Sequence, residues 1–140
     1  MPGKNFIKIP SIFMAVSGVI SIVLYLVIDL ILACGTIDTG EPLGWMVVAI
    51  AVIYTVFAVL EFHAAAIGIK YCDCAEKAAF LKKKGFLLIL ASLIAGASNT
   101  IFSILQGDPA IPALTSAVLG LFFPLLYTYG ASLNEKAGQY

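Results

Sequence analysis

The chain has 140 residues, of which 61% are hydrophobic and only 11% are charged. Soluble domains carry about 25% charged residues, so this composition excludes an ordinary soluble protein and indicates an integral membrane protein. Eight basic residues, all of them lysines, balance eight acidic residues, which argues against a nucleic-acid partner and against sites that need the planar fork of arginine.

Four long apolar runs predict four membrane-spanning helices, because about 20 apolar residues are needed to cross a ~30 Å hydrocarbon core. The predicted spans cover residues 10–33, 46–69, 85–105 and 111–133. The first run is much longer than the roughly 7–15 apolar residues of a signal peptide, so we expect it to remain as a span. The chain is therefore predicted to form a single integral membrane domain over residues 1–140.

The connections between the spans differ in charge. Residues 35–44 are rich in glycine and contain a proline, and residues 106–109 form a short acidic turn; neither segment contains a lysine. Residues 70–84 hold five of the eight lysines, the N-terminal segment holds two and the C-terminal tail holds one. Positive residues concentrate on the cytoplasmic side of a membrane. The sequence thus predicts an all-α four-helix bundle made of two hairpins, with both termini cytoplasmic in a plasma membrane.

Asp29 and Glu61 are the two acidic residues inside the predicted spans, where ionisable groups are costly and are candidates for function. Asp29 lies in the outer third of the first span, and Glu61 lies in the inner third of the second. At a rise of 1.5 Å per residue, each lies roughly 8–10 Å from the midplane on opposite sides. They are therefore too far apart to share a proton, and Asp29 is expected to reach the outer headgroups.

Glu61 has two interpretations that the sequence leaves open. It shares one helix face with the small residues Ala58, Ala65 and Gly68, so this face should point into the bundle. Tyr127 and Ser92 reach a similar depth from other spans. Glu61 is either a neutral acid that bonds one of these two hydroxyls for structural reasons, which we expect, or an intramembrane proton or cation site formed by Glu61, Tyr127 and Ser92.

Other polar residues give weaker signals. His63 is two residues from Glu61 and points to another face, so we expect it to contact water or headgroups near the inner interface. Cys72 and Cys74 are separated by one residue and have no second pair of ligands, which argues against a structural zinc site. No metal site, cofactor or catalytic residue is predicted, and we do not expect an enzyme.

Small residues recur at helical spacing in three of the spans. Stripes of this kind let membrane helices approach closely, so we expect them at helix contacts inside the bundle. The candidate packing residues are Ser92, Gly96 and Thr100 in the third span and Gly120 in the fourth, with Ser17, Ser21 and Tyr25 forming a further stripe in the first.

Two parts of the chain carry a resemblance. The first comprises Gly-Ile-Lys at 68–70, Glu-Lys-Ala at 76–78 and Lys-Lys-Gly at 83–85; the second is Pro-Leu-Leu-Tyr-Thr-Tyr-Gly-Ala-Ser-Leu-Asn at 124–134. Together they resemble small, uncharacterised four-span membrane proteins of Gram-positive bacteria. The resemblance implies a bacterial plasma-membrane protein and assigns no active-site residues.

These observations favour a structural or accessory membrane protein. We expect it to act through helix–helix contacts with itself, as a homo-oligomer, or with a larger membrane-protein partner in the lipid bilayer. The alternative is a small proton- or cation-coupled transporter or channel that uses Glu61. Contact of the Glu61 carboxyl with a dry, hydrogen-bonded environment favours the first function, and a water-filled cavity beside it favours the second.

Overall fold

The computed structural model describes residues 1–31, 34–35 and 43–138, without the side chains of residues 28, 29, 43 and 44. Helix α1 (Lys4–Val23) continues as the π-helical segment η1 (Leu24–Asp29), and after it come α3 (Leu43–Tyr71), the 3-10 turn η2 (Ala75–Lys77), α4 (Ala78–Gln106) and α5 (Ala110–Ala137). Four of the described helices are long and apolar enough to cross a membrane. The predicted all-α architecture with four long apolar helices is therefore confirmed.

The helices extend further than the apolar runs that predicted them. Helix α1 begins at Lys4, although the predicted span began at Pro10, and α4 begins at Ala78, although the predicted span began at Gly85. Hydropathy marks only the part of a helix that fits the hydrocarbon. With 29 residues, α4 is roughly 43 Å long at a rise of 1.5 Å per residue. It can therefore carry Lys82, Lys83 and Lys84 beyond a ~30 Å core.

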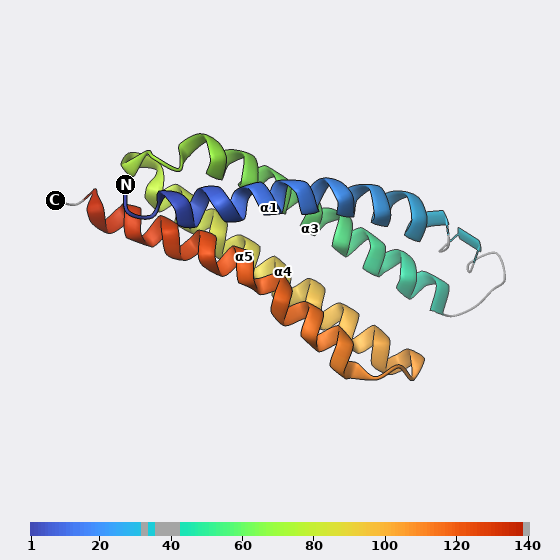
Figure 1. Cartoon of the computed structure of the whole chain (residues 1–140). Coiled ribbons are helices and arrows are strands. Elements are labelled where there is room, and N and C mark those ends of the chain that lie inside the picture. The colour runs from blue at the N-terminus through green and yellow to red at the C-terminus, as the bar shows by residue number, and fades with distance from the viewer. Residues whose placement is uncertain (32–33, 36–42, 139–140) are drawn as a thin grey trace.

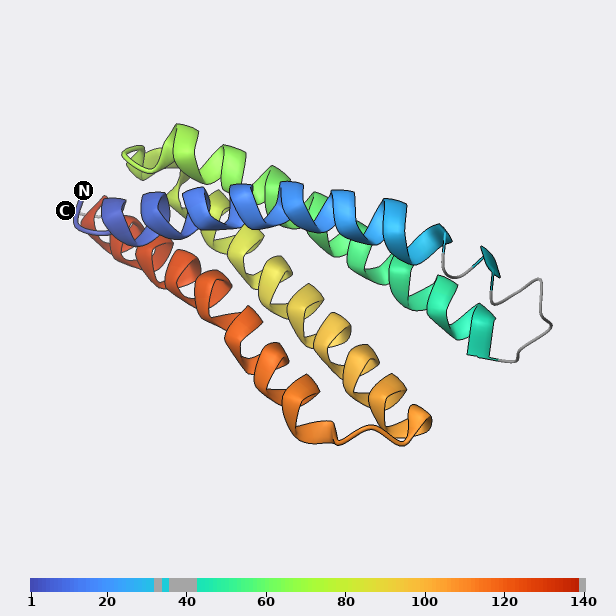
Figure 2. The same ribbon diagram turned by 45° about the vertical axis from the view of Figure 1, so that its right-hand side comes forward.

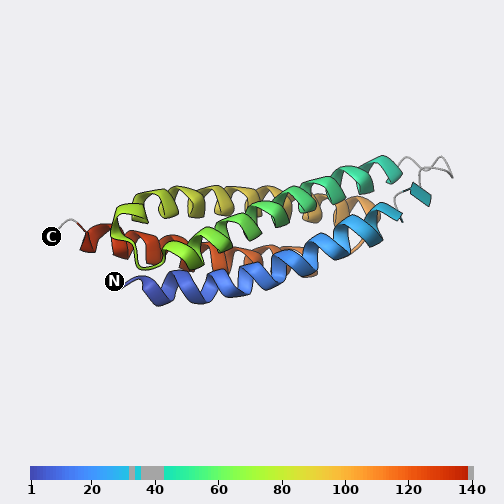
Figure 3. The same ribbon diagram turned by 90° about the horizontal axis from the view of Figure 1, so that it is seen from above.

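The helices form two antiparallel hairpins, α1 with α3 and α4 with α5, which lie side by side at one end and diverge toward the other (Figures 1 and 2). We call the end that holds Gly3, the turn at Cys74 and Asn134 the closed end. The opposite end, which holds the start of α3 and the turn at Gly107, is the open end. The view from above shows the N-terminus, the end of α5 and the α3–α4 connection at the closed end (Figure 3).

The hydrophobic core lies in the closed half of the bundle. Its buried side chains come from all four helices and from the turn after α3, and they are Ile7, Met14, Ala64, Ala65, Cys72, Leu81, Leu88, Tyr127 and Ala131. The largest is Tyr127, which is fully buried. Its hydroxyl donates a hydrogen bond to the Ala64 carbonyl at 3.3 Å and so links α5 to α3.

Asn134 joins three parts of the chain at the closed end. Its side-chain oxygen accepts a hydrogen bond of 2.8 Å from the Gly3 amide, and its side-chain nitrogen donates one of 2.8 Å to the Cys72 carbonyl. Asn134 is fully buried, so these backbone groups would have no water to replace it. The N-terminus, the end of α3 and the end of α5 are therefore held in one register.

Of the two turns at the open end, the structure describes the α4–α5 turn in full. Gly107 follows α4 with φ +82°, a left-handed conformation that glycine adopts without strain, and its amide bonds the Ile104 carbonyl at 3.1 Å. The predicted turn at 106–109 is thus present. Residues 36–42 of the predicted first loop and the Asp29 side chain lie outside the described residues.

Candidate functional site

Glu61 lies in the interface between α1 and α3. It is 8% exposed, and its neighbours on the same face of α3, Ala58 and Ala65, are fully buried. The Ser17 hydroxyl of α1 is 3.1 Å from Glu61 Oε1, within hydrogen-bond distance. The Glu61 face of α3 therefore points into the bundle, as the small residues on it predicted.

The structure does not join Glu61 to the two hydroxyls proposed from the sequence. The Tyr127 hydroxyl donates to the Ala64 carbonyl, and the Ser92 hydroxyl is buried without a hydrogen-bond partner among the described residues. The expected contact of Glu61 with Tyr127 or Ser92 is therefore wrong at the level of the hydrogen bond. The reason is the pairing of the helices: Glu61 faces α1, whereas Ser92 lies on α4.

Ser17 is the hydrogen-bond partner of Glu61, and it was not predicted from the sequence. Its hydroxyl is also 3.2 Å from the Met14 carbonyl, one turn earlier in α1. A serine hydroxyl has one proton, so a neutral Glu61 that donates to Ser17 allows Ser17 to donate to Met14. Ser17 belongs to the predicted stripe of small and polar residues in the first span, and this stripe could have identified it as a partner of Glu61. The depth of a residue in the membrane does not show which span faces α3.

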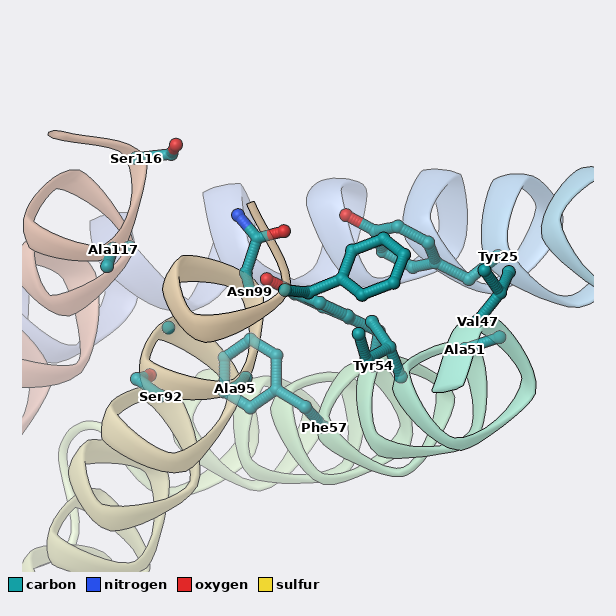
Figure 4. A pocket seen from close by; sticks show the side chains of 14 residues that line it. Tyr25, Val47, Ala51, Tyr54, Phe57, Ser92, Ala95, Asn99, Ser116 and Ala117 are labelled. Atoms are coloured by element: carbon teal, nitrogen blue, oxygen red, sulfur yellow. The ribbon is translucent and has the colours of Figure 1, made fainter. Parts of the chain in front are cut away.

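A cavity with uncharged polar walls lies elsewhere, between the two hairpins in the open half, and we call it the inter-hairpin cleft (Figure 4). Its volume is about 440 Å³, within the range of ligand-sized pockets. The residues that line it are Tyr25, Val47, Ile50, Ala51, Tyr54, Phe57, Ser92, Ala95, Gly96, Asn99, Phe102, Ser116, Ala117 and Gly120. Glu61 is not among them.

The cleft presents uncharged polar groups from separate helices. Tyr54 of α3, Asn99 of α4 and Ser116 of α5 are on different walls (Figure 4). The Tyr25 and Tyr54 rings stack with their centroids 4.8 Å apart and close the α1–α3 side. The Ser116 hydroxyl donates to the Pro112 carbonyl at 2.7 Å, within its own helix.

Two polar groups of α4 in the cleft lack such a bond. Ser92 is 6% exposed and its hydroxyl has no partner among the described residues. No hydrogen bond joins the half-buried Asn99 amide to any part of the chain that the structure describes. The Asn99 amide is half-buried on the wall of the cleft, so a molecule in the cleft could form a hydrogen bond with it.

The small residues of α4 and α5 have different surroundings. A methyl group added at Gly96 would lie 2.6 Å from the Ala117 Cβ, so Gly96 is a close contact between α4 and α5. Thr100 is half-buried, and its hydroxyl donates to the Gly96 carbonyl at 2.9 Å. Gly120 is exposed, and no atom lies within 4 Å of an added methyl group. Gly96 thus packs as expected, and the expectation for Gly120 is wrong within this chain because the hairpins diverge there.

The described residues contain no group of three or more histidine, cysteine or acidic side chains that could hold a metal ion. Cys72 is buried in the core at the closed end, and Cys74 is half-buried in the turn that follows. Neither thiol lines the inter-hairpin cleft.

No protein-family model, curated protein or solved structure matches this chain.

Proposed function

We propose that this chain is an integral membrane protein of accessory type, which acts by receiving a transmembrane helix of a partner protein in the inter-hairpin cleft. The single observation that carries the proposal is the cleft itself, with the half-buried Asn99 side chain on its wall. Hydrocarbon chains offer no hydrogen bonds, so a polar group at membrane depth finds its partner on another helix. A helix with a polar side chain supplies that partner.

The composition of the walls supports a helix as the occupant. Ala51, Ala95, Ala117 and Gly120 present little more than backbone to the cleft. Small residues at a helix interface allow the two backbones to approach closely, which strengthens their packing in the absence of a hydrophobic driving force. Charged side chains are absent from the described lining, so the contacting segment of the partner should itself be uncharged.

The surroundings of Glu61 favour this function over proton or cation transport. The carboxyl is buried and bonded to Ser17, and it lies outside the cavity that could hold water. A transport site needs an aqueous path to the titrating group. A buried acid between α1 and α3 is better explained as part of the packing inside one hairpin.

The placement in the membrane is proposed on the distribution of the lysines. The closed end holds the beginning of α1, the α3–α4 connection and the end of α5, and all eight lysines lie in or next to these segments. By the positive-inside rule, the closed end is cytoplasmic and the open end is external. The resemblance of residues 124–134 to bacterial four-span proteins supports a bacterial plasma membrane. A single cysteine at Asp108 should then react with an impermeant maleimide in intact cells, and one at Ala79 should not.

Photo-crosslinking in native membranes tests the proposal. A benzoylphenylalanine residue is placed at Asn99 in the cleft or, as the control, at Leu119, which is 66% exposed on the outer face of α5. We expect a discrete protein adduct from position 99 and only lipid adducts from position 119. The adduct should map to one apolar helix of the partner. A cleft that yields no protein adduct, or an equal yield at both positions, would contradict the proposal; an adduct to this same chain would make the partner a second copy.

A further inference from the structure

A second cavity lies at the closed end, between the last turns of α3 and the beginning of α4, and we call it the lysine groove. Its volume is about 500 Å³. The residues that line it are His63, Ala66, Ile67, Lys70, Tyr71, Lys77 and Phe80. It contains two lysines and a histidine, and no acidic side chain is among the described residues of its lining. The groove therefore has an excess of positive charge.

Neither lysine of the groove forms an ion pair in the part of the chain that the structure describes. In the described part of the chain, the ion pairs at this end join Lys4 to Asp73 at 2.6 Å and Lys82 to Glu135 at 2.8 Å. Lys70 lies 5.2 Å from the centre of the Tyr71 ring, a contact that orients an ammonium group without cancelling its charge. Lys70 and Lys77 thus remain available to an anion.

The groove also has an apolar part that leads away from the lysines. Lys70 is in the last turn of α3, and His63 is seven residues earlier, which is roughly 10 Å along the helix axis. Ala66 and Ile67 lie between them, and Phe80 of α4 faces them across the cavity. The lining therefore changes from two lysines at the helix end to Ala66, Ile67 and Phe80, with His63 at its far end.

We propose that the lysine groove binds one acidic phospholipid, with its phosphate between Lys70 and Lys77 and the first carbons of its acyl chains along Ala66 and Phe80. Basic pockets between membrane helices at their charged end suit anionic headgroups, and the bond from an ammonium to a phosphate oxygen is charge-assisted. A free phosphate ester would use only the cationic part. The apolar part is what selects a lipid. This site is separate from the inter-hairpin cleft, so either proposal can fail alone.

Native mass spectrometry of the purified protein in detergent measures the binding. Phosphatidylglycerol is titrated against neutral phosphatidylcholine with the same acyl chains, and glycerol 3-phosphate is added as a soluble competitor. We expect one tightly bound phosphatidylglycerol and a clear preference over phosphatidylcholine. The double variant Lys70→Gln/Lys77→Gln should bind it roughly tenfold more weakly, because each lysine near the membrane surface contributes to the attraction.

The matched control is Lys83→Gln/Lys136→Gln, which removes two exposed lysines at the same end of the bundle that do not line the groove. It should keep the wild-type affinity within about twofold, since charge farther away is screened. An equal loss in both double variants would overturn the proposal, because the attraction would then belong to the whole basic end. Helical content measured by circular dichroism verifies that each variant is folded.

A third variant tests the apolar part without changing any charge. Ala66 is exposed in the groove, so Ala66→Phe should fill the groove and leave the fold intact. We expect phosphatidylglycerol binding to fall severalfold while any weak binding of glycerol 3-phosphate is unchanged. Unaltered lipid binding in this variant, or displacement of the lipid by an equimolar amount of glycerol 3-phosphate, would show that the groove is not a lipid site.

Discussion

The closed and open ends of this bundle both contain glycines and asparagines on their helices, but these residues are packed closely at one end and loosely at the other. At the closed end, Gly130 lets α5 approach the N-terminal segment so closely that an added methyl group would be 2.8 Å from the Phe6 backbone. At the open end, the same methyl group at Gly120 would meet nothing within 4 Å. Helix α5 thus contains Gly130, where the close contact with Phe6 leaves no room for a side chain, and Gly120, where a side chain would meet no other atom.

Asparagines show the same contrast. Asn134 at the closed end is fully buried and bonds two backbone groups, whereas Asn99 at the open end is half-buried in the cleft. Residues of one type therefore have a structural role at one end and an unused bonding capacity at the other. The closed end is thus closely packed and hydrogen-bonded, and the open end is the one at which we propose that another molecule binds.

The largest expected effect comes from placing the same bulky residue at the two glycines of α5. Gly130→Leu should destabilise the protein by about 1–3 kcal/mol or more, because the contact with Phe6 cannot be kept. Gly120→Leu should be nearly silent in the isolated protein. Thermal unfolding in detergent, followed by circular dichroism, measures both. Equal melting temperatures for the two variants would contradict the claim that the closed end is packed more closely than the open end.

The next effect concerns the two asparagines. Asn134→Ala leaves the Gly3 amide and the Cys72 carbonyl unpaired, which should cost about 1–3 kcal/mol for each group that stays buried. Asn99→Ala should change the stability by less than about 0.5 kcal/mol, as is usual away from packed contacts. Denaturant titration of both variants checks this. A larger loss at Asn99 would mean that the cleft is closed in solution.

The smallest effect is expected at Glu61. Glu61→Gln keeps the shape of the side chain and its hydrogen bond with Ser17, so the loss of stability should stay below about 1 kcal/mol. Proton flux into liposomes should be the same for this variant, the wild type and empty vesicles. A flux that the wild type supports and that a folded Glu61→Gln protein lacks would favour transport over the accessory function.

The resemblance noted in the sequence coincides with the closed end. In the stretch at 124–134, Tyr127 forms a hydrogen bond with Ala64 and Asn134 forms one with Gly3. Gly130 of the same stretch allows the N-terminal segment to approach α5 closely. Gly68 faces Ser11 and Tyr127 in the same region. The residues of this motif are thus explained by packing and hydrogen bonding inside the fold.

The sequence was sufficient to predict the helices and the hairpins, because hydropathy and lysine placement depend on residues close together in the chain. It could not predict which helix faces Glu61, since Ser17, Ser92 and Tyr127 all carry a hydroxyl at a suitable depth. That choice follows from the pairing of α1 with α3. The sequence also could not predict the cleft. Gly96 and Gly120 both belong to stripes of small residues, but Gly96 contacts Ala117 whereas Gly120 has no neighbour, because the hairpins diverge there.

The divergence itself is measured most directly by electron-spin distances between α1 and α5 in nanodiscs. Spin labels are placed in a background without the three native cysteines, on exposed positions spaced seven residues apart so that each pair presents nearly the same helix faces. From the closed end outward, the pairs are Ile9 with Tyr129, Val16 with Phe122, and Val23 with Thr115. We predict that the distance between the labels increases from each pair to the next. Three equal distances would show parallel hairpins and would contradict the existence of an open end.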